Sequence, residues 1–579
     1  MRRRRALPAL LPVLLLVLSL LLTGCSVTAD QITDLLEGGW FTSDTDGPDD
    51  TEADPDAEST EDEADTDGDT EDAEAESETE EAETEESETE EAETEETDAD
   101  SAEVIEAQQA AVISLPMDAD AGLNPFTSTS LANSAFFPLI YESLFTVTPE
   151  FTAEPLLCRD YTCSDDELTW AFGIQQGVYF SDGSSLTADD VVYSLELAWE
   201  SELYSARFAY VESITATSDY QVVITLTTAM ENLPVLLDIP IVRSGTGYAS
   251  SPAGTGPYVL TVSGDTGTLV QSGLWWQDTE LPFRRIELVQ IDDVLDQRDK
   301  FENGEVDLVL TDPNTIGAAT YHSDYELWSQ DTTIMQYLGF NMDSSIFTLD
   351  SIRSAMTHLL DRATIVSDYA GSMALAACLP CSPASSLYDT KLAANYDYDL
   401  EAFEEAIEEA GLTDSDGDGI LEWYGVPMSG TLLVCSDSTQ RVYVANYIAD
   451  LMNELGFDIT VDALPDDEYQ EAMYYRNFDF YLAEVRLTAD FDLTSFFTSG
   501  GIMNYGGMTN EDVVELCEAS LENSGNYYNL FETIMDEGLL CPILFKTRAV
   551  YSSRGAVSGL DPAPSNIFYN LAEISCYGN

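Results

Sequence analysis

The sequence predicts an α/β fold, because segments with strand character alternate with segments of helical periodicity. QVVITLTT (221–228) and LLVCS (432–436) have the length and the β-branched content of strands. VANYIADLMNELG (444–456) has apolar residues at helical spacing and ends at Gly456, a residue typical of helix C-termini. Long loops and this mixed order favour α/β over all-β. At 579 residues the chain exceeds one compact core, so we expect two or three folded units plus tails.

The N-terminus, MRRRRALPALLPVLLLVLSLLLTGC, predicts a signal peptide over residues 1–24. Four arginines precede an uncharged run from Ala6 to Leu22, and this run of 17 residues contains Pro8 and Pro12. It is a poor spanning helix, since about 20 apolar residues are needed to cross a bilayer. The ending LLTGC resembles the lipobox of bacterial lipoproteins, which implies a lipid on the thiol of Cys25 and a place at the extracellular face of the bacterial cytoplasmic membrane. An ordinary signal with an incidental cysteine is the alternative.

A tether (25–43) and an acidic segment (44–103) follow. The acidic segment holds 33 Asp and Glu in 60 residues and no Lys or Arg, and SETEEAETEESETEEAETEE (77–96) repeats a five-residue unit four times. Such a segment buries almost nothing and repels itself, so we expect a disordered linker that acts as a spacer. A calcium-binding brush or a phase-separating tail is the alternative.

The net charge of −90 constrains the partners of the chain. Only 16 Lys and Arg follow the four N-terminal arginines, so the rest of the chain is also strongly acidic. Nucleic acid and anionic membrane surfaces would be repelled, and we expect a monomer with neutral or cationic partners.

Cysteine spacing leaves the disulfides open. If Cys25 carries lipid, eight cysteines remain in an oxidising compartment, which permits up to four disulfides. Cys158 and Cys163, and likewise Cys378 and Cys381, are close enough in sequence for local bridges. A redox role for CLPC (378–381) is disfavoured, because no βαβ context surrounds the motif.

Motifs for catalysis or for a cofactor are missing from the sequence. Its two histidines are His322 and His358, and it has no HExxH, GxSxG, GxxxxGK[ST] or GxGxxG pattern. We therefore expect no enzyme, no catalytic residue and no cofactor.

DSDGDGILE (414–422) is a metal-like pattern. Asp414, Asp416 and Asp418 match the first half of a calcium loop, but the twelfth position is Gly425 rather than a bidentate glutamate. A plain turn after the helix LEAFEEAIEEAGL, which Gly411 would cap, is the preferred interpretation. Weak calcium binding is the alternative.

FSDGSSLTADDVVYSLELAWE (180–200) mixes a turn, hydroxyls and carboxylates with a helical pattern. Thr187 is a good N-cap for the helix, and Asp190 lies three residues further on, as in a capping box. FGIQQGVYFSDGSSLTADDVVYSLE also resembles the signature of the family 5 extracellular solute-binding proteins, which bind peptides or nickel for ABC importers. Seven further segments resemble this family in order along residues 112–574: LNPF (123–126), LIYESLF (139–145), GTGPYVL (254–260), FENGEVDLVL (301–310), YLGFNMD (337–343), RSAMTHLLDRATIV (353–366) and CPILFKTRAVYSSRGAVSGL (541–560).

The resemblance implies two α/β lobes of the type II periplasmic-binding fold, with a hinge, a cleft and an extra subdomain in lobe I. Lobe I would comprise residues 104–336 and 549–579, and lobe II residues 337–548. The implied function is capture of a short peptide in the cleft and delivery to the ABC permease subunits. A binder of nickel, haem or an oligosaccharide on the same fold and, less plausibly, an extracellular hydrolase are the alternatives.

The resemblance also implies ligand-binding residues. A strand edge near Ser130 and Leu131 would pair with the peptide main chain. In the segment RLTADFDLTSFF (486–497), Asp490 matches the aspartate that pairs with the ligand α-ammonium in peptide-binding members, and Asp492 is the alternative. The remaining candidates are Tyr204, Asn341, Tyr469, Arg486 and Leu487, and for Asn341 a structural role is equally expected.

Overall fold

The computed structural model of the protein describes residues 111–264, 266–312, 321–344 and 346–576. The predicted signal peptide, Cys25, the tether and the acidic segment lie outside the described residues. None of the helices described is both long and apolar enough to cross a membrane.

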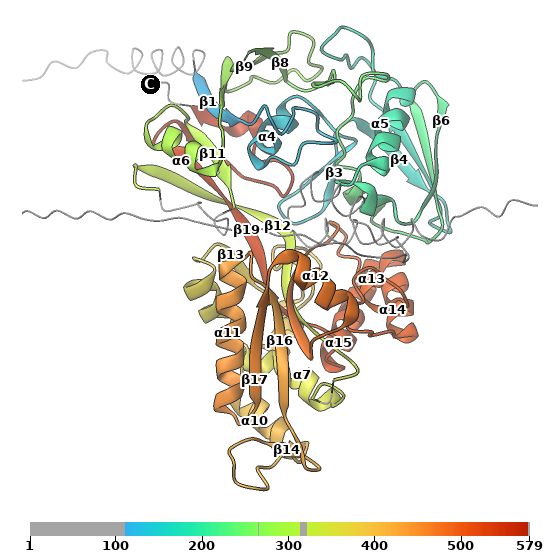
Figure 1. The fold of residues 1–579 in the computed structure, drawn as a ribbon. Coiled ribbons are helices and arrows are strands. Elements are labelled where there is room, and N and C mark those ends of the chain that lie inside the picture. The colour runs from blue at the N-terminus through green and yellow to red at the C-terminus, as the bar shows by residue number, and fades with distance from the viewer. Residues whose placement is uncertain (1–110, 265, 313–320, 345, 577–579) are drawn as a thin grey trace, which may run out of the picture. The chain divides into compact units, whose positions relative to one another are not determined.

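The first part of the described chain forms two separate sheets, which lie in the upper half of Figure 1. We call these sheets and their helices the N-terminal group. One sheet, in the order β1–β10–β9–β8, contains β1 (Val112–Met117), β10 (Arg285–Gln290), β9 (Thr266–Gln271) and β8 (Tyr258–Ser263). The other, in the order β4–β5–β7–β6, contains β4 (Cys158–Cys163), β5 (Thr169–Ile174), β7 (Gln221–Leu226) and β6 (Val211–Ser218). The short strands β2 (Phe145–Val147) and β3 (Ala153–Pro155) pair with each other.

Helix α5 (Ala188–Glu200) packs against β6 and begins as its sequence predicts. Thr187 and Asp190 form the expected capping box, in which an Asp190 carboxylate oxygen accepts from the Thr187 N–H at 2.9 Å and from its hydroxyl at 2.8 Å. The other Asp190 oxygen accepts from the N–H of Ser244. These bonds fix the start of α5, so Thr187 and Asp190 belong to the scaffold of the fold. The other helices of this group are α4 (Leu131–Phe136), η1 (Phe137–Leu139), η2 (Ser205–Phe208), η3 (Leu233–Leu236) and α6 (Val294–Glu302).

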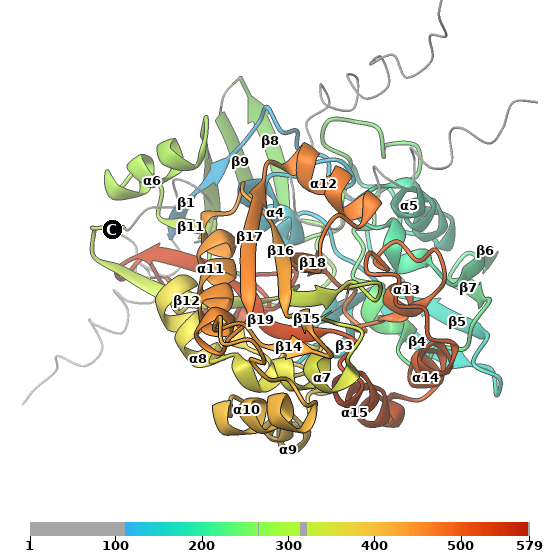
Figure 2. The same cartoon turned by 60° about the horizontal axis from the view of Figure 1, so that its bottom comes forward.

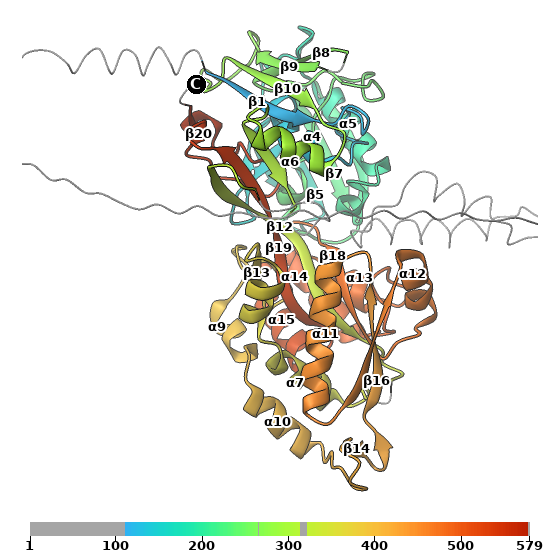
Figure 3. The ribbon, with the colours of Figure 1, turned by 60° about the vertical axis from the view of Figure 1, so that its left-hand side comes forward.

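Two long strands, β12 (Tyr325–Phe340) and β19 (Cys541–Ser553), leave the N-terminal group and continue into a second group of helices and strands (Figures 1 and 3). We call this second group, whose elements lie between β12 and β19 in the chain, the C-terminal group. They pair antiparallel along most of their length, with a register shift between Asp331 and Met335 of β12. Residues 549–552 of β19 pair with β11 (Leu308–Thr311). Residues 334–340 of β12 pair with β18 (Phe480–Arg486). The complete order is β11–β19–β12–β18–β16–β17, and β13 (Ala374–Ala376) also pairs with β19. We call β12 and β19 the hinge strands.

The C-terminal group buries both faces of this sheet. In β16 (Ser429–Cys435), Leu432 and Val434 join a core with α7 (Asp350–Leu359) and α11 (Thr439–Glu454). Leu433 and Cys435 join the core that contains helices α12 to α15, which lie within residues 466–536. Successive strand side chains point to opposite faces, so a strand covered on both sides reads as a continuous apolar run. Figure 2 shows α11 lying along β16 and β17.

The helices and short strands of this group complete the fold. They are α7 (Asp350–Leu359), α8 (Arg362–Thr364), η4 (Ile365–Tyr369), α9 (Thr390–Ala393), η5 (Ala394–Tyr396), α10 (Leu400–Glu409), β14 (Glu422–Trp423), β15 (Val426–Pro427), α11 (Thr439–Glu454), β17 (Asp458–Leu464), α12 (Asp466–Tyr475), α13 (Thr494–Phe497), α14 (Glu511–Glu522), η6 (Ser524–Asn526) and α15 (Tyr527–Asp536). After β19, β20 (Val557–Ser558), η7 (Leu571–Glu573) and β21 (Ser575–Cys576) end the described chain.

The local predictions of secondary structure are confirmed. Residues 221–228 contain β7, residues 432–436 overlap β16, and α11 ends before Gly456, whose φ of +91° is the left-handed conformation expected there. Gly411, with φ +75°, likewise follows α10.

The structure contradicts a local bridge between Cys158 and Cys163, which the spacing had left open. These residues are the two ends of β4, and five strand residues span roughly 16 Å, whereas a disulfide needs Cα atoms within about 7 Å. All eight cysteines of the described ranges are free thiols, including Cys378 and Cys381.

Candidate functional site

The segment that follows β18 is anchored to the first hinge strand. Leu487 is buried, its N–H donates to the carbonyl of Thr333 at 3.0 Å, and its own carbonyl accepts from the Thr333 hydroxyl at 2.6 Å. The hydroxyl of Tyr527 on α15 donates to the carbonyl of Asp490 at 2.6 Å. The backbone on both sides of the Ala489–Asp490 pair is therefore fixed.

Asp490 is a buried carboxylate with an open acceptor. The residue is 4% exposed, and its Oδ1 has no hydrogen-bond partner among the described residues. Burial, and next the negative charge of Asp492, raises the pKa of the Asp490 carboxyl to about 6. A buried carboxylate without a complementary group is costly, so this oxygen is suited to a cationic donor.

Asp492 differs from Asp490 because its oxygens already have partners. Oδ1 accepts from the N–H of Thr494 at 2.9 Å and from its hydroxyl at 2.6 Å, next to the start of α13. Oδ2 accepts from the hydroxyl of Tyr210 in the N-terminal group at 2.9 Å. Asp492 thus holds two parts of the fold together, and of the two aspartates Asp490 has the unused acceptor.

Polar and charged side chains cover one face of the hinge strands. Lys546 of β19 pairs with Asp312 at 2.6 Å and with Glu484 of β18 at 3.6 Å, and all three side chains are at most 23% exposed. Gln336 of β12 donates to Glu484 at 3.0 Å and to Gln440 at 2.9 Å. A buried polar network of this kind is stable only when its members satisfy one another, as these do.

Tyr204 and Arg207 belong to the N-terminal group. The Tyr204 hydroxyl donates to the carbonyl of Pro125 at 3.3 Å, and its ring packs edge-on against Phe126. The guanidinium of Arg207 lies 5.2 Å from the centre of the Tyr204 ring and forms an ion pair with Asp238. Tyr204 is therefore held in place by local contacts.

A strand edge at Ser130 and Leu131 is a wrong prediction. Ser130 is the N-cap of α4, where its hydroxyl accepts from the N–H of Asn133, and Leu131 is the first residue of that helix. Ser at an N-cap is locally favourable, because its side chain satisfies a free amide of the first turn. These residues cannot supply a free strand edge to a peptide.

The three remaining candidates lie in the C-terminal group. Asn341 is buried, donates to the carbonyls of Phe478 at 2.8 Å and Arg476 at 3.4 Å, and accepts from the N–H of Asp343, so its contacts are those of a structural residue. Tyr469 on α12 is 1% exposed, and its hydroxyl has no hydrogen-bond partner in the described ranges. Arg486, at the end of β18, keeps solvent contact.

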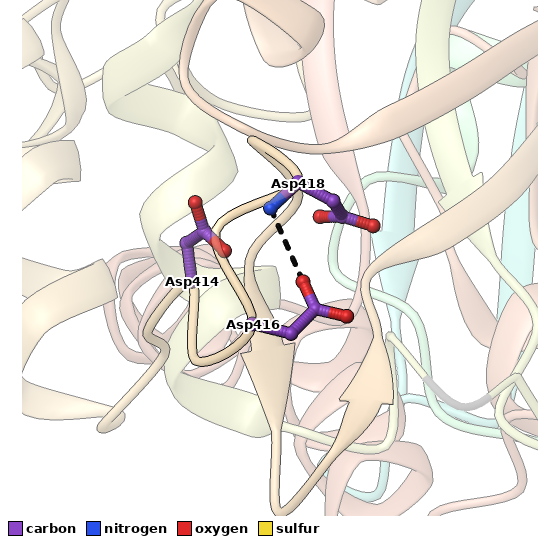
Figure 4. Close-up of side chains that lie close together, drawn as sticks. All are labelled: Asp414, Asp416 and Asp418. Carbon is purple, nitrogen blue, oxygen red and sulfur yellow. Dashed lines mark hydrogen bonds between the residues drawn. The ribbon is translucent and has the colours of Figure 1, made fainter.

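The loop with Asp414, Asp416 and Asp418 is exposed, and their carboxylate oxygens lie within 4.8 Å of one another (Figure 4). Each carboxylate accepts from loop N–H groups: Asp414 from Gly417 and Gly419, Asp416 from Asp418, and Asp418 from Ile420. These are the bonds of the predicted turn, and weak calcium binding at this loop stays the alternative.

A small cavity of about 20 Å³ lies between β12, β18 and the segment 496–508. Phe340, Tyr481, Phe496, Met503 and Met508 are among the residues that line it. This volume holds about one water molecule and not a peptide.

Sequence reasoning missed Tyr210, Arg207 and Lys546. No local pattern around Tyr210 points to a site. The two basic residues had one usable signal, namely the rarity of Lys and Arg in so acidic a chain.

Comparison with known proteins identifies the family of the chain. Residues 152–503 match the sequence model of "Bacterial extracellular solute-binding proteins, family 5 Middle". The chain is 23% identical over 395 residues to the oligopeptide-binding protein AppA of Bacillus subtilis (strain 168), which covers 62% of this chain and 69% of AppA.

Solved structures share the fold. Bacillus subtilis AppA in complex with a nonapeptide superposes with a TM-score of 0.58 at 20% identity, over 81% of this chain and 99% of AppA. NikZ from Campylobacter jejuni in complex with Ni(L-His) gives a TM-score of 0.59 at 20% identity, over 81% of this chain and 99% of NikZ. The hinge strands thus join two lobes, as in these proteins. The chain belongs to the bacterial extracellular solute-binding proteins of family 5, the substrate-binding components of ABC importers, and is not an enzyme.

Proposed function

We propose that this protein is a lipid-anchored receptor that captures short peptides outside the cell and delivers them to the permease of an ABC importer. The ligand would lie in a cleft between lobe I (104–336 and 549–579) and lobe II (337–548), and closure about the hinge strands would enclose it. Cys25 would carry the lipid, and residues 44–103 would hold the lobes away from the membrane.

One observation carries the proposal: the buried carboxylate of Asp490 has an oxygen without a partner, next to an aspartate whose oxygens are occupied. Ligand α-ammonium is a suitable donor, because a charge-assisted bond would compensate for the desolvation of this carboxylate. Tyr210 and Thr494 keep Asp492 from this role, so the two aspartates divide between ligand recognition and support of the loop. AppA, described as an oligopeptide-binding protein, supports a peptide as the ligand class.

The test compares free and blocked peptides. A library of unmodified peptides two to five residues long would be screened for binding, and the best ligand would be titrated calorimetrically beside its N-acetylated form. Asp490→Asn should weaken binding of the free peptide roughly ten- to hundredfold, since a buried charge-assisted hydrogen bond is worth about 1.5–3 kcal/mol. The acetylated peptide should bind wild type and Asp490→Asn alike.

Equal affinity of both peptides for wild type would overturn recognition of the amino end by Asp490. Mass spectrometry of the compounds that co-purify with the gently isolated protein is an independent arm. A metal chelate or an oligosaccharide in place of peptides would overturn the peptide proposal as a whole.

A further inference from the structure

Two buried phenylalanines have a left-handed backbone conformation. Phe151 has a φ of +58° and is 5% exposed, and Phe491 has a φ of +57° and is 0% exposed. The Cβ atom of an L-residue crowds the backbone in this region, so a bulky side chain is rare there and glycine is preferred. Such residues persist only where the surrounding contacts hold them, and they are concentrated at ligand sites. The contacts of the two rings therefore indicate why phenylalanine stands at these positions.

Phe151 lies in the turn between β2 and β3 of the N-terminal group. The N–H of Thr148 donates to the carbonyl of Thr152 at 2.8 Å and closes the turn, and the N–H of Phe151 donates to the carbonyl of Thr148 at 3.0 Å. Next to Phe151, the carbonyl of Glu150 accepts from the N–H of Ser386 in the C-terminal group at 3.1 Å. The tip of this hairpin thus rests on the C-terminal group.

Phe491 lies between the two aspartates of the candidate site. Its ring packs edge-on against the ring of Phe151, with the ring centres 5.3 Å apart, and against the ring of Phe545 on the hinge strand β19, with the centres 6.0 Å apart. We call Phe151, Phe491 and Phe545 the aromatic clamp. Edge-on contacts at these distances stabilise aromatic pairs beyond the burial of their area. The clamp therefore holds Phe491 from the N-terminal group and from the hinge at once.

The backbone around Phe491 is fixed as well. Its N–H donates to the carbonyl of Thr488 at 3.0 Å, and the carbonyl of Asp490 accepts from the hydroxyl of Tyr527. The chain has two soft dihedral angles per residue, so the φ and ψ of Phe491 set how the side chains of Asp490 and Asp492 point relative to each other. A return of Phe491 to a negative φ would change that relative orientation.

We propose that Phe151 and Phe491 are positioning residues, whose ring contact holds Asp490 in the orientation in which its open oxygen meets the ammonium group of the ligand. This inference rests on the proposed function, because Asp490 is the ligand group there. The contact crosses between the two lobes, so separation of the lobes would release the ring of Phe491 and the constraint on Asp490. A ligand favours one arrangement of the lobes only if it binds that arrangement better. An Asp490 that is oriented only while the lobes meet supplies this difference.

The first test uses the best unmodified peptide from the library and its N-acetylated form. Phe151→Leu removes one ring and leaves the loop 488–492 unchanged, so binding of the unmodified peptide should weaken about three- to tenfold. In an Asp490→Asn background the same substitution should change the affinity by less than about twofold, because the group that it positions is absent. Phe283→Leu removes a buried ring that packs against Phe568, and this matched control should show no such coupling to Asp490→Asn.

The second test needs no ligand. Burial raises the pKa of the Asp490 carboxyl, so wild type should lose stability to urea between pH 4.5 and pH 7.5. Release of the loop should expose this carboxyl to water and lower its pKa. Phe151→Leu and Phe491→Leu should therefore lose less stability between the two pH values than wild type does, and Phe283→Leu should lose as much. The titratable neighbours of Asp490, namely Asp492, Tyr210 and Tyr527, are the same in all four proteins.

The two tests separate this inference from the proposed function. An equal loss of stability in wild type, Phe151→Leu and Phe491→Leu overturns the positioning of Asp490. Additive effects of Phe151→Leu and Asp490→Asn, on a peptide whose free amine wild type prefers, overturn it too. If the loss of stability is smaller in both variants but wild type binds free and acetylated peptides equally, the positioning stands and the proposed role of Asp490 in ligand recognition is wrong.

Discussion

The hydroxyl of Tyr210 donates a 2.9 Å hydrogen bond to Oδ2 of Asp492, and thereby joins two residues 282 positions apart. Tyr210 lies directly before β6 in the N-terminal group, and Asp492 follows β18 in the C-terminal group. Burial, and next the charge of Asp492, raises the pKa of the Tyr210 hydroxyl, so it remains a protonated donor. The bond links the two lobes beside Asp490.

Tyr210→Phe removes this bond and keeps the ring. We expect ligand affinity to fall about three- to tenfold, because a hydrogen bond of this kind contributes about 0.5–1.5 kcal/mol net and joins the two lobes beside the proposed ligand site. Calorimetric titration with the best library peptide measures the loss. Tyr248→Phe, at a tyrosine that is 83% exposed, is the control and should bind as wild type does. Unchanged affinity in Tyr210→Phe would show that this bond does not support the bound state.

Asp490→Asn should stabilise the ligand-free protein near pH 7.5 while it weakens binding. The folded-state pKa of about 6 lies above the ordinary aspartate value of 3.8, so the folded protein binds the proton more tightly than the unfolded chain does. Stability contributed by the protonated carboxyl is therefore present at low pH and is lost as the pH rises from about 4 to 6. Urea unfolding at pH 4.5 and 7.5 should show that Asp490→Asn is the more stable protein at pH 7.5, by about 1–3 kcal/mol. A variant less stable than wild type at pH 7.5 would contradict the conclusion that the buried charge of this carboxylate destabilises the folded protein.

Glu142 gives a second pH dependence of stability, and it lies far from Asp490 in the sequence. Its buried carboxylate accepts from the indole N–H groups of Trp275 and Trp276 and from the hydroxyl of Thr255, and burial raises its pKa to about 7. The sign is the same as for Asp490: the stability that comes from the protonated form is lost as the pH rises from about 4.5 to 7.

Glu142→Gln keeps the shape and an acceptor, so the fall in unfolding midpoint between pH 5 and pH 8 should be smaller in this variant than in wild type. Glu142→Ala leaves the buried donors unsatisfied and should cost about 2–5 kcal/mol at both pH values. Glu280→Gln, at an exposed glutamate, should follow wild type. An undiminished pH dependence in Glu142→Gln would assign the effect to another group.

Cys25→Ser tests the anchor. We expect loss of metabolic lipid labelling and release of the protein from the membrane fraction, because the thiol is the proposed site of lipid attachment. Labelling with a radioactive or clickable fatty acid and fractionation of the cells measure both effects. Full membrane retention of Cys25→Ser would contradict the lipoprotein proposal.

The sequence by itself determined the local features and the family. The capping box at Thr187 and Asp190, and the glycines that follow α10 and α11, involve residues only a few positions apart, so their pattern is readable without tertiary information. The family motifs, present in order, gave the fold for the same reason: each is a short contiguous segment.

Only the tertiary structure decided which residues meet. The sequence favoured Asp490 over Asp492 only by likeness to a motif. Their physical difference arises because Tyr210 and Thr494 bind both oxygens of Asp492, whereas Oδ1 of Asp490 has no partner among the described residues. The network of polar side chains on one face of the hinge strands depends on the pairing of β18, β12 and β19. These strand pairs join residues far apart in the chain. Ser130 shows the converse. The family resemblance implied a strand edge at this residue, but Ser130 is the N-cap of α4. Periodicity and spacing report contacts within one segment, whereas a site made from several segments is fixed by strand register and packing, which no local pattern encodes.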